Sequence, residues 1–249
     1  MRLKISVVEY LNSYPLYKTI NSDIFDIIPD DPALCSKRLA EGSVDIGLIP
    51  IMGYRNSYFI IPDISISSPG EVKSVLLVLK KPIEQCNKIS LSPHSISSNI
   101  IARIIVKEFL KADWLQFGNF DEFDGKIVIG DEALKIYRQN SGIIYDVAKL
   151  WKHYTGLPTV FAFWASNKPL TKDLVNLLKK AKRDGINNIH KLAEQFYLKN
   201  RYADTAFFED YLKNSICYDL TESEKKAIAL EYQLAYKYRL IEKKEPKFL

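Results

Sequence analysis

The chain has 249 residues, of which 47% are hydrophobic and 26% are charged, and its formal net charge is +5 at pH 7. These values are typical of a globular protein and exclude a largely disordered chain. The basic residues are scattered along the sequence rather than massed, so no nucleic-acid-binding surface is expected.

Cysteine usage and the N-terminal sequence bear on the compartment. Cys35, Cys86 and Cys217 are widely spaced and odd in number, which predicts reduced thiols rather than a disulfide framework. No apolar run approaches the roughly 20 residues that a membrane-spanning helix needs. Met1 leads directly into a strand-like alternation without the apolar core of a signal peptide. We therefore expect a cytoplasmic protein that does not associate with a membrane.

The first 50 residues alternate between predicted strands and helices. Apolar runs at 3–8, 25–28 and 44–49 predict strands. Helices are expected to begin at Pro15 and Pro32, because the missing N–H of proline is tolerated in the first helical turn. This βαβαβ pattern with short connections favours a mostly parallel sheet with helices on its faces.

The middle of the chain repeats the alternation, and the last third is almost entirely helical. The predicted elements are strands at 60–66, 74–79, 89–91, 114–117 and 127–129, helices up to about 111, from 131 and over 145–154, a strand at 159–166, and helices within 170–238. The strand at 159–166 is apolar enough to be buried on both faces.

Two α/β units in series, followed by a helical tail, predict an α/β fold of two lobes. We expect residues 1–80 and 166–249 to form lobe 1 and residues 81–165 to form lobe 2, with strands near 74–80 and 159–166 crossing between them. A ligand in such a fold lies in the cleft, where strand ends meet loops and helix N-termini.

The stretch 89–111 contains a candidate anion site. Its short strand breaks near Ser92, and Ser95 or Ser97 is a natural N-cap for the helix that follows. The amides of the first turn and the positive end of the helix dipole favour an anion at this position. An ordinary capped turn has the same local sequence, so both interpretations stay open at this point.

Asn12 and Asp131 each follow a predicted strand and precede a predicted helix. Each can cap that helix or present its side chain to a ligand from the strand end. His94 can bind an anion from its loop, whereas His153 and His190 are expected on exposed helix faces. The sequence contains no P-loop, nucleophile-elbow, zincin or clear dinucleotide-binding motif.

Six short segments occur in a distinctive order along the first two thirds of the chain. They are YLNSYPL (10–16), DIGLIP (45–50), SISS (95–98), IGDEAL (129–134), YD (145–146) and TGLPTVFA (155–162). Each segment alone is weak, but together they resemble the chorismate dehydratase family of the futalosine-dependent menaquinone biosynthesis pathway. The resemblance covers roughly residues 3–167 by motif and the helical tail by character only.

The resemblance implies a type II periplasmic-binding-protein-like fold, with two α/β lobes, a ligand cleft between them and a helical C-terminal region. It also implies a carbon–oxygen lyase that removes water from chorismate to give 3-[(1-carboxyvinyl)oxy]benzoate. Positions that match the family's motifs give Asn12 as the catalytic residue and Ser95, Ser97, Ser98, Pro50 and Asp131 as substrate-binding residues.

The resemblance implies no cofactor and no metal, with chorismate as the small-molecule partner. No side chain in the motifs is an obvious base for the ring proton, so a substrate-assisted elimination is expected, in which a carboxylate of chorismate takes the proton. A homodimer formed through the helical tail stays open.

Two departures from the family pattern concern Gly53, where a glutamate is frequent, and Ser97, where a threonine is frequent. Glycine removes a carboxylate, whereas serine keeps the hydroxyl. One alternative is 1,4-dihydroxy-6-naphthoate synthase, which has the same fold, but residues 142–146 lack the histidine that this enzyme uses. A second alternative is a non-catalytic cytosolic binding protein for a small organic anion, with lobes that close on the ligand.

Overall fold

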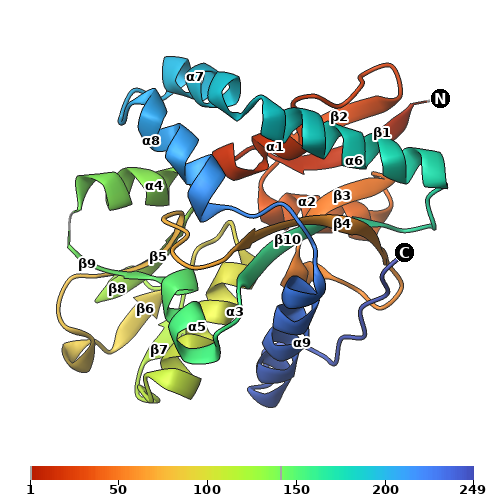
Figure 1. Cartoon of the computed structure of the whole chain (residues 1–249). Coiled ribbons are helices and arrows are strands. Elements are labelled where there is room, and N and C mark those ends of the chain that lie inside the picture. The colour runs from red at the N-terminus through yellow and green to blue at the C-terminus, as the bar shows by residue number, and fades with distance from the viewer. Residues whose placement is uncertain (1, 141) are drawn as a thin grey trace.

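The computed structural model describes residues 2–140 and 142–249, which form two lobes that each contain a five-stranded sheet (Figure 1). Met1 and Ser141 lie outside the described residues. The predicted lack of a signal peptide concerns a segment that begins at Met1 and so lies partly outside them. Within the two described ranges, no helix combines the length and apolar character needed to cross a membrane.

The first sheet has the strand order β2-β1-β3-β10-β4. Its strands are β1 (Leu3–Val8), β2 (Phe25–Asp30), β3 (Ile46–Pro50), β4 (Phe59–Ser68) and β10 (Thr159–Ser166). β1 runs parallel to β2 and β3, whereas β10 is antiparallel to β3 and β4. β10 therefore brings the chain back into this sheet after the second sheet has been formed.

The second sheet has the strand order β7-β6-β8-β5-β9. Its strands are β5 (Val75–Leu79), β6 (Lys88–Ser90), β7 (Gln116–Gly118), β8 (Gly125–Ile129) and β9 (Ile143–Asp146). β6 is parallel to β7 and β8, and β5 is antiparallel to β8 and β9. The parallel strands β1, β2, β3, β6 and β8 are each followed by a helix or a helical turn, whereas β7 leads to β8.

Helices cover both sheets, as Figure 1 shows. Their bounds are α1 (Tyr14–Tyr17), α2 (Pro32–Glu41), α3 (Ile96–Ile104), α4 (Gly130–Gln139), α5 (Val147–Thr155), α6 (Lys172–Asn187), α7 (Ile189–Lys199), α8 (Thr205–Asp210) and α9 (Glu222–Lys237). α2 packs on β1 and β3, and α6 packs on β4 and α1. α9 contacts both β10 and α3, so it joins the first sheet to a helix of the other lobe.

Short helical turns complete the path of the chain. They are the 3₁₀ turns η1 (Leu11–Ser13), η2 (Ile51–Gly53) and η3 (Ile83–Gln85), and the π-helical turns η4 (Ile105–Phe109) and η5 (Tyr211–Ser215). η1 follows β1 and η2 follows β3, so both turns extend from neighbouring strand ends toward the second lobe.

Local sequence explains several element boundaries. α2 begins at Pro32, and the Asp31 side chain accepts a hydrogen bond from Leu34 N at 2.8 Å. It ends at Gly42, whose φ of 70° is left-handed and favours glycine. All eight residues of β10 are buried, which confirms the prediction of a strand covered on both faces.

The helix predicted over 145–154 is wrong at its start. Tyr145 and Asp146 belong to β9, where they pair with Leu77 and Leu76 of β5, and α5 begins only at Val147. The sequence pattern misses this strand because pairing with β5, a tertiary contact, decides the conformation of these residues.

Candidate active site

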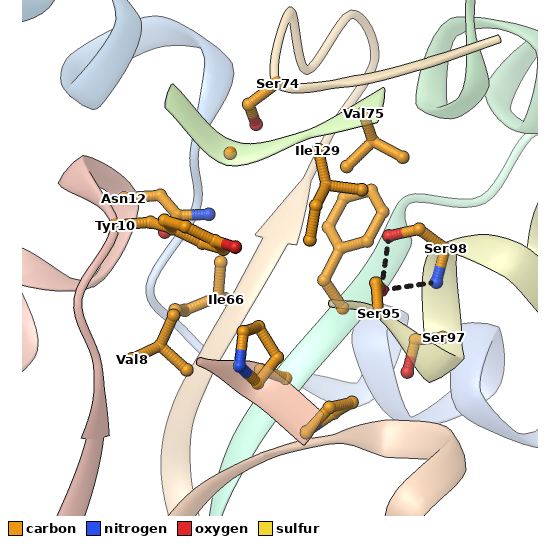
Figure 2. Close-up of a pocket in the computed structure, with 15 residues that line it drawn as sticks. Val8, Tyr10, Asn12, Ile66, Ser74, Val75, Ser95, Ser97, Ser98 and Ile129 are labelled. Atoms are coloured by element: carbon orange, nitrogen blue, oxygen red, sulfur yellow. Dashed lines mark hydrogen bonds between the residues drawn. The ribbon is translucent and has the colours of Figure 1, made fainter. Parts of the chain in front are cut away.

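A pocket lies between the two lobes and is lined by residues of both sheets and of the first turns of α3 and α4. Figure 2 shows Tyr10 and Asn12 on one side and Ser95, Ser97 and Ser98 on the opposite side. The full lining is Val8, Tyr10, Asn12, Pro32, Pro50, Ile66, Ser74, Val75, Ser95, Ser97, Ser98, Ile129, Gly130, Phe161 and Ala162.

The start of α3 supplies the serine side of the pocket. Ser95 is the N-cap: it has extended backbone, and its Oγ accepts a hydrogen bond from Ser98 N at 3.1 Å. The Ser95 hydroxyl donates to Ser98 Oγ at 2.9 Å, so the two side chains form one buried pair (Figure 2). Asn99 holds the preceding loop, because its side chain bonds both Ser92 N and Ser92 O.

Ser97 connects this helix start to the first lobe. Its Oγ accepts a hydrogen bond from Met52 N in η2 at 3.1 Å, and the side chain is buried. Pro50 ends β3 just before this turn and lines the pocket. The predicted residues Ser95, Ser97, Ser98 and Pro50 therefore meet in one place, although about 45 residues separate Ser97 from Met52.

The arrangement suits an anionic ligand without a basic side chain. Of the lining residues within 2–140 and 142–249, none is lysine or arginine. Hydroxyl groups and the N-terminal end of α3 supply the favourable electrostatics instead, because helix dipoles and first-turn amides stabilise negative charge. Ser95 caps the helix, as one interpretation predicts, and the capped helix start faces the pocket, where anion binding stays a prediction.

Asn12 does not cap a helix. Ser13 occupies the N-cap position of α1, and its hydroxyl donates to the backbone oxygens of Val8 and Tyr10. The Asn12 side chain points into the pocket (Figure 2), and its Oδ1 is buried without a hydrogen-bond partner among the described residues. A buried amide oxygen without a partner is costly, and in Figure 2 it is the amide nitrogen of Asn12 that is directed toward the pocket.

Asp131 does not cap a helix either, because Ile129 is the N-cap of α4 and makes no side-chain cap bond. The Asp131 Oδ1 instead accepts a hydrogen bond from Leu11 N at 3.1 Å, across the lobes. Burial raises the pKa of Asp131 to about 6, against the lowering effect of the Leu11 amide. Asp131 lies behind the Asn12 turn and outside the pocket lining, and its contact with substrate stays a prediction.

The histidines lie away from the pocket lining. His94 is 57% exposed, and its Nδ1 lies 3.5 Å from the Asp31 carboxylate. His153 and His190 are exposed, as predicted, and His190 pairs with Glu209. The suggested anion-binding role of His94 thus gains no support from the geometry.

Tyr10 is the one titratable side chain that lines the pocket within the described part of the chain. Burial, together with the carboxylates of Asp31, Asp131 and Glu132, raises its pKa to about 12. The phenol therefore stays protonated at neutral pH and can donate a hydrogen bond, but it is a poor base.

Gly53 lies outside the pocket lining, in η2. A Cβ at this position would lie 2.3 Å from the Oγ of Ser36, which packs beneath the turn from α2. A side chain at position 53 therefore requires Ser36 to move, and glycine fits the local packing of this chain.

Several lining residues had no role assigned from the sequence, among them Tyr10, Ser74 and Phe161. Tyr10 precedes the recognised Asn12 turn, and Ser74 precedes β5 and accepts a hydrogen bond from the Tyr211 hydroxyl at 2.8 Å. Phe161 lies in β10, where the register with β4 shifts between Val160 and Ala162. An apolar residue in an apolar strand carries no local signal of this role.

Residues 3–237 match the model of a protein family described as menaquinone biosynthesis. The chain is 27% identical over 218 residues to the chorismate dehydratase of Thermus thermophilus, covering 76% of this chain and 80% of that protein. It is 26% identical over 221 residues to the chorismate dehydratase of Campylobacter jejuni, covering 88% of this chain and 87% of that protein.

Solved structures agree on the fold at low sequence identity. Protein AF1704 from Archaeoglobus fulgidus superposes with a TM-score of 0.79 at 13% identity, covering 96% of this chain and 98% of that one. The periplasmic aliphatic sulphonate binding protein SsuA from Escherichia coli gives 0.62 at 15% identity, covering 100% and 93%. The chain therefore has a periplasmic-binding-protein-like fold, and it belongs to the menaquinone biosynthesis family.

Proposed function

We propose that this protein is a chorismate dehydratase, a hydro-lyase that converts chorismate into 3-[(1-carboxyvinyl)oxy]benzoate and water. Family membership and two relatives named chorismate dehydratase support the proposal. The single observation that carries it in this chain is the pocket between Asn12 and the serine cluster of α3. 1,4-Dihydroxy-6-naphthoate synthase is not favoured, because neither relative carries that name.

The pocket has groups that match the substrate. Chorismate carries two carboxylates, and Ser95, Ser97 and Ser98 offer hydroxyl groups beside the N-terminal end of α3. Hydrogen bonds to a charged group contribute about 1.5–3 kcal/mol each. One carboxylate can therefore be held at α3 while the apolar side chains of Ile66, Phe161 and their neighbours contact the ring.

The reaction needs a base and a leaving group. A ring C–H bond breaks, its electron pair forms the last double bond of the aromatic ring, and the neighbouring C–O bond breaks to release hydroxide. The proton taken from carbon is returned to this hydroxide, so the products are the aromatic ether and water. Aromatisation favours the products, and the barrier lies in deprotonating carbon.

A substrate-assisted step fits the side chains of this pocket. Tyr10 is protonated at neutral pH and cannot accept the ring proton. The second carboxylate of chorismate is then the base, and holding it close to the C–H group can contribute roughly 7–11 kcal/mol when the geometry is good. Asn12 would orient the reacting part of chorismate through its unpartnered amide.

The proposal also assigns the enzyme to the cytoplasm. Cys35, Cys86 and Cys217 are free thiols, which fit a reducing compartment.

The experiment is to incubate the purified protein with chorismate and follow an aromatic product by absorbance and mass. We expect a product lighter than chorismate by one water. Saturable binding without any product would replace the enzyme by a binding protein for a small organic anion. Neither binding nor turnover would overturn the assignment of chorismate as the substrate.

A further inference from the structure

The residues that precede Asn12 are held by the opposite lobe. Leu11 N donates to the carboxylate of Asp131, the second residue of α4, at 3.1 Å. Leu11 itself is fully buried and begins η1, the turn that contains Asn12. The position of the Asn12 backbone is therefore coupled to α4 through one hydrogen bond between the lobes.

A second contact reinforces the same junction. The Tyr10 ring lies against Gly130, where a Cβ would approach three ring carbons at 3.0 Å. The φ of Gly130 is 65°, a left-handed conformation that favours glycine. The first two residues of α4 thus hold the two residues that lead into Asn12, one through ring packing and one through a backbone hydrogen bond.

From this geometry we infer that Asp131 is a positioning residue of the dehydration reaction, which fixes the Asn12 turn by accepting the Leu11 N–H. The inference rests on the proposed function and adds a role that the pocket lining does not reveal. Helix capping does not account for Asp131, because Ile129 occupies the N-cap position of α4. Asp131 does not line the pocket, and the contact that its Oδ1 makes in the structure is with Leu11 N.

The hydrogen bond from Leu11 N, rather than the negative charge of Asp131, is what holds the Asn12 turn in place. An asparagine at 131 keeps an oxygen acceptor of similar reach, whereas alanine leaves the buried Leu11 N–H without a partner. Loss of the bond lets the Asn12 turn move, and a displacement of about 1 Å at a reacting group can lower the rate roughly 100-fold.

The test compares Asp131→Asn and Asp131→Ala with the wild type, using kcat and KM for chorismate. Glu132→Ala is the matched control, because Glu132 is the next residue on α4, is exposed and pairs only with Lys126 in the described structure. We expect Asp131→Ala to lower kcat by roughly 10- to 100-fold with little change in KM. Asp131→Asn and Glu132→Ala should stay within about threefold of the wild type.

Amide hydrogen exchange at Leu11 and Asn12, measured without chorismate, provides a readout that does not depend on the proposed function. Exchange should be at least about tenfold faster in Asp131→Ala than in the wild type, and unchanged in Asp131→Asn. If Asp131→Ala does not fold, Asp131→Ser, whose side chain is too short to reach Leu11, replaces it with the same expectations.

Three results would overturn the inference. Asp131→Asn as slow as Asp131→Ala would show that the charge matters, and wild-type kcat with wild-type exchange in Asp131→Ala would show that the bond is dispensable. A raised KM with unchanged kcat would indicate direct substrate contact. If the wild type itself does not turn over chorismate, the proposed function fails, and the exchange measurement still decides whether Asp131 fixes the turn.

Discussion

Asn12 shows how the position of one residue in the fold separates a helix cap from a residue that lines the pocket. Its sequence context suits a helix cap as well as a ligand contact, and only the position of Ser13 at the start of α1 separates the two. The Oδ1 of Asn12 is buried and has no hydrogen-bond partner among the described residues. This oxygen therefore contributes no hydrogen bond to the stability of the folded protein.

Replacing Asn12 with alanine should lower kcat for chorismate by about 100-fold, because the loss of one oriented polar group at a reacting centre typically costs 10²–10³. The free energy of unfolding should change by less than about 1 kcal/mol, since the amide oxygen has no protein partner to lose. Steady-state kinetics and urea unfolding measure the two effects. Asn214→Ala, at an exposed position of η5, is the control, and equal kcat in both variants would remove the assignment.

Ser97→Ala removes both a hydroxyl that faces the pocket and the acceptor for Met52 N. We expect kcat/KM for chorismate to fall about 10-fold or more, together with a loss of about 1 kcal/mol in the free energy of unfolding. Ser97→Thr keeps the hydroxyl and should retain most of the activity. Unchanged kinetics in Ser97→Ala would exclude this serine from the substrate site.

The raised pKa of Asp131 predicts a pH-dependent stability difference. Burial, with a contribution from Glu9, raises this pKa from 3.8 to about 6. Between these pH values the unfolded chain has released the proton while the folded chain still binds it, so wild-type stability falls as pH rises through this window. Asparagine does not titrate.

Asp131→Asn should therefore gain stability relative to the wild type between pH 4 and pH 6, by at most about 3 kcal/mol, because a pKa difference of one corresponds to about 1.4 kcal/mol. Urea unfolding of both proteins at several pH values checks this expectation. Burial also raises the pKa of Asp146 to about 6, but both proteins contain this group, so its contribution to the difference cancels. A difference that is constant with pH would contradict the raised pKa.

At the scale of elements, one aspartate joins a helix start to the segment between the sheets. Asp146 caps α5 by accepting from Lys149 N at 2.9 Å, and it also accepts from Lys73 N at 2.6 Å and Val72 N at 3.2 Å. Residues 72 and 73 lie between β4 and β5, where the chain passes from one sheet to the other. Asp146 thus orders this connection.

Asp146→Ala should lower the free energy of unfolding by roughly 2–4 kcal/mol, because it removes a cap and leaves two further amides without their acceptor. Urea unfolding measures the effect. Asp173→Ala, which removes an exposed acidic residue from the first turn of α6, is the matched control and should change stability by less than about 0.5 kcal/mol. Equal values for the two variants would show that the Asp146 bonds do not stabilise the connection.

Most elements could be predicted from the sequence because the spacing of their apolar residues agrees with the residues that begin and end them. Asp31, Pro32 and Gly42 delimit α2, and the continuous apolar run of β10 marks a buried strand. β9 could not be predicted, since its residues 143–146 become a strand by pairing with β5, and the π-helical end of α3 at 105–109 likewise has no local signature.

At the scale of the molecule, the site exists only where the lobes meet. Motif order brought Asn12, Pro50 and the serines of α3 into one hypothesis, and the fold places all of them on the pocket. Ser74 and Phe161 could not be predicted, because their convergence depends on how β5 and β10 pack rather than on their own sequence context. The expected lobe boundaries at 80 and 166 stay a prediction.

Chorismate bound between the lobes is the central feature of the proposed function, and a crystal structure of Asn12→Ala soaked with chorismate tests it most directly, because slow turnover preserves the substrate. We predict chorismate in the pocket, with one carboxylate within about 2.7–3.2 Å of the Ser97 or Ser98 hydroxyl or a first-turn amide of α3. An empty pocket at saturating chorismate, or chorismate bound elsewhere on the molecule, would contradict the proposed site.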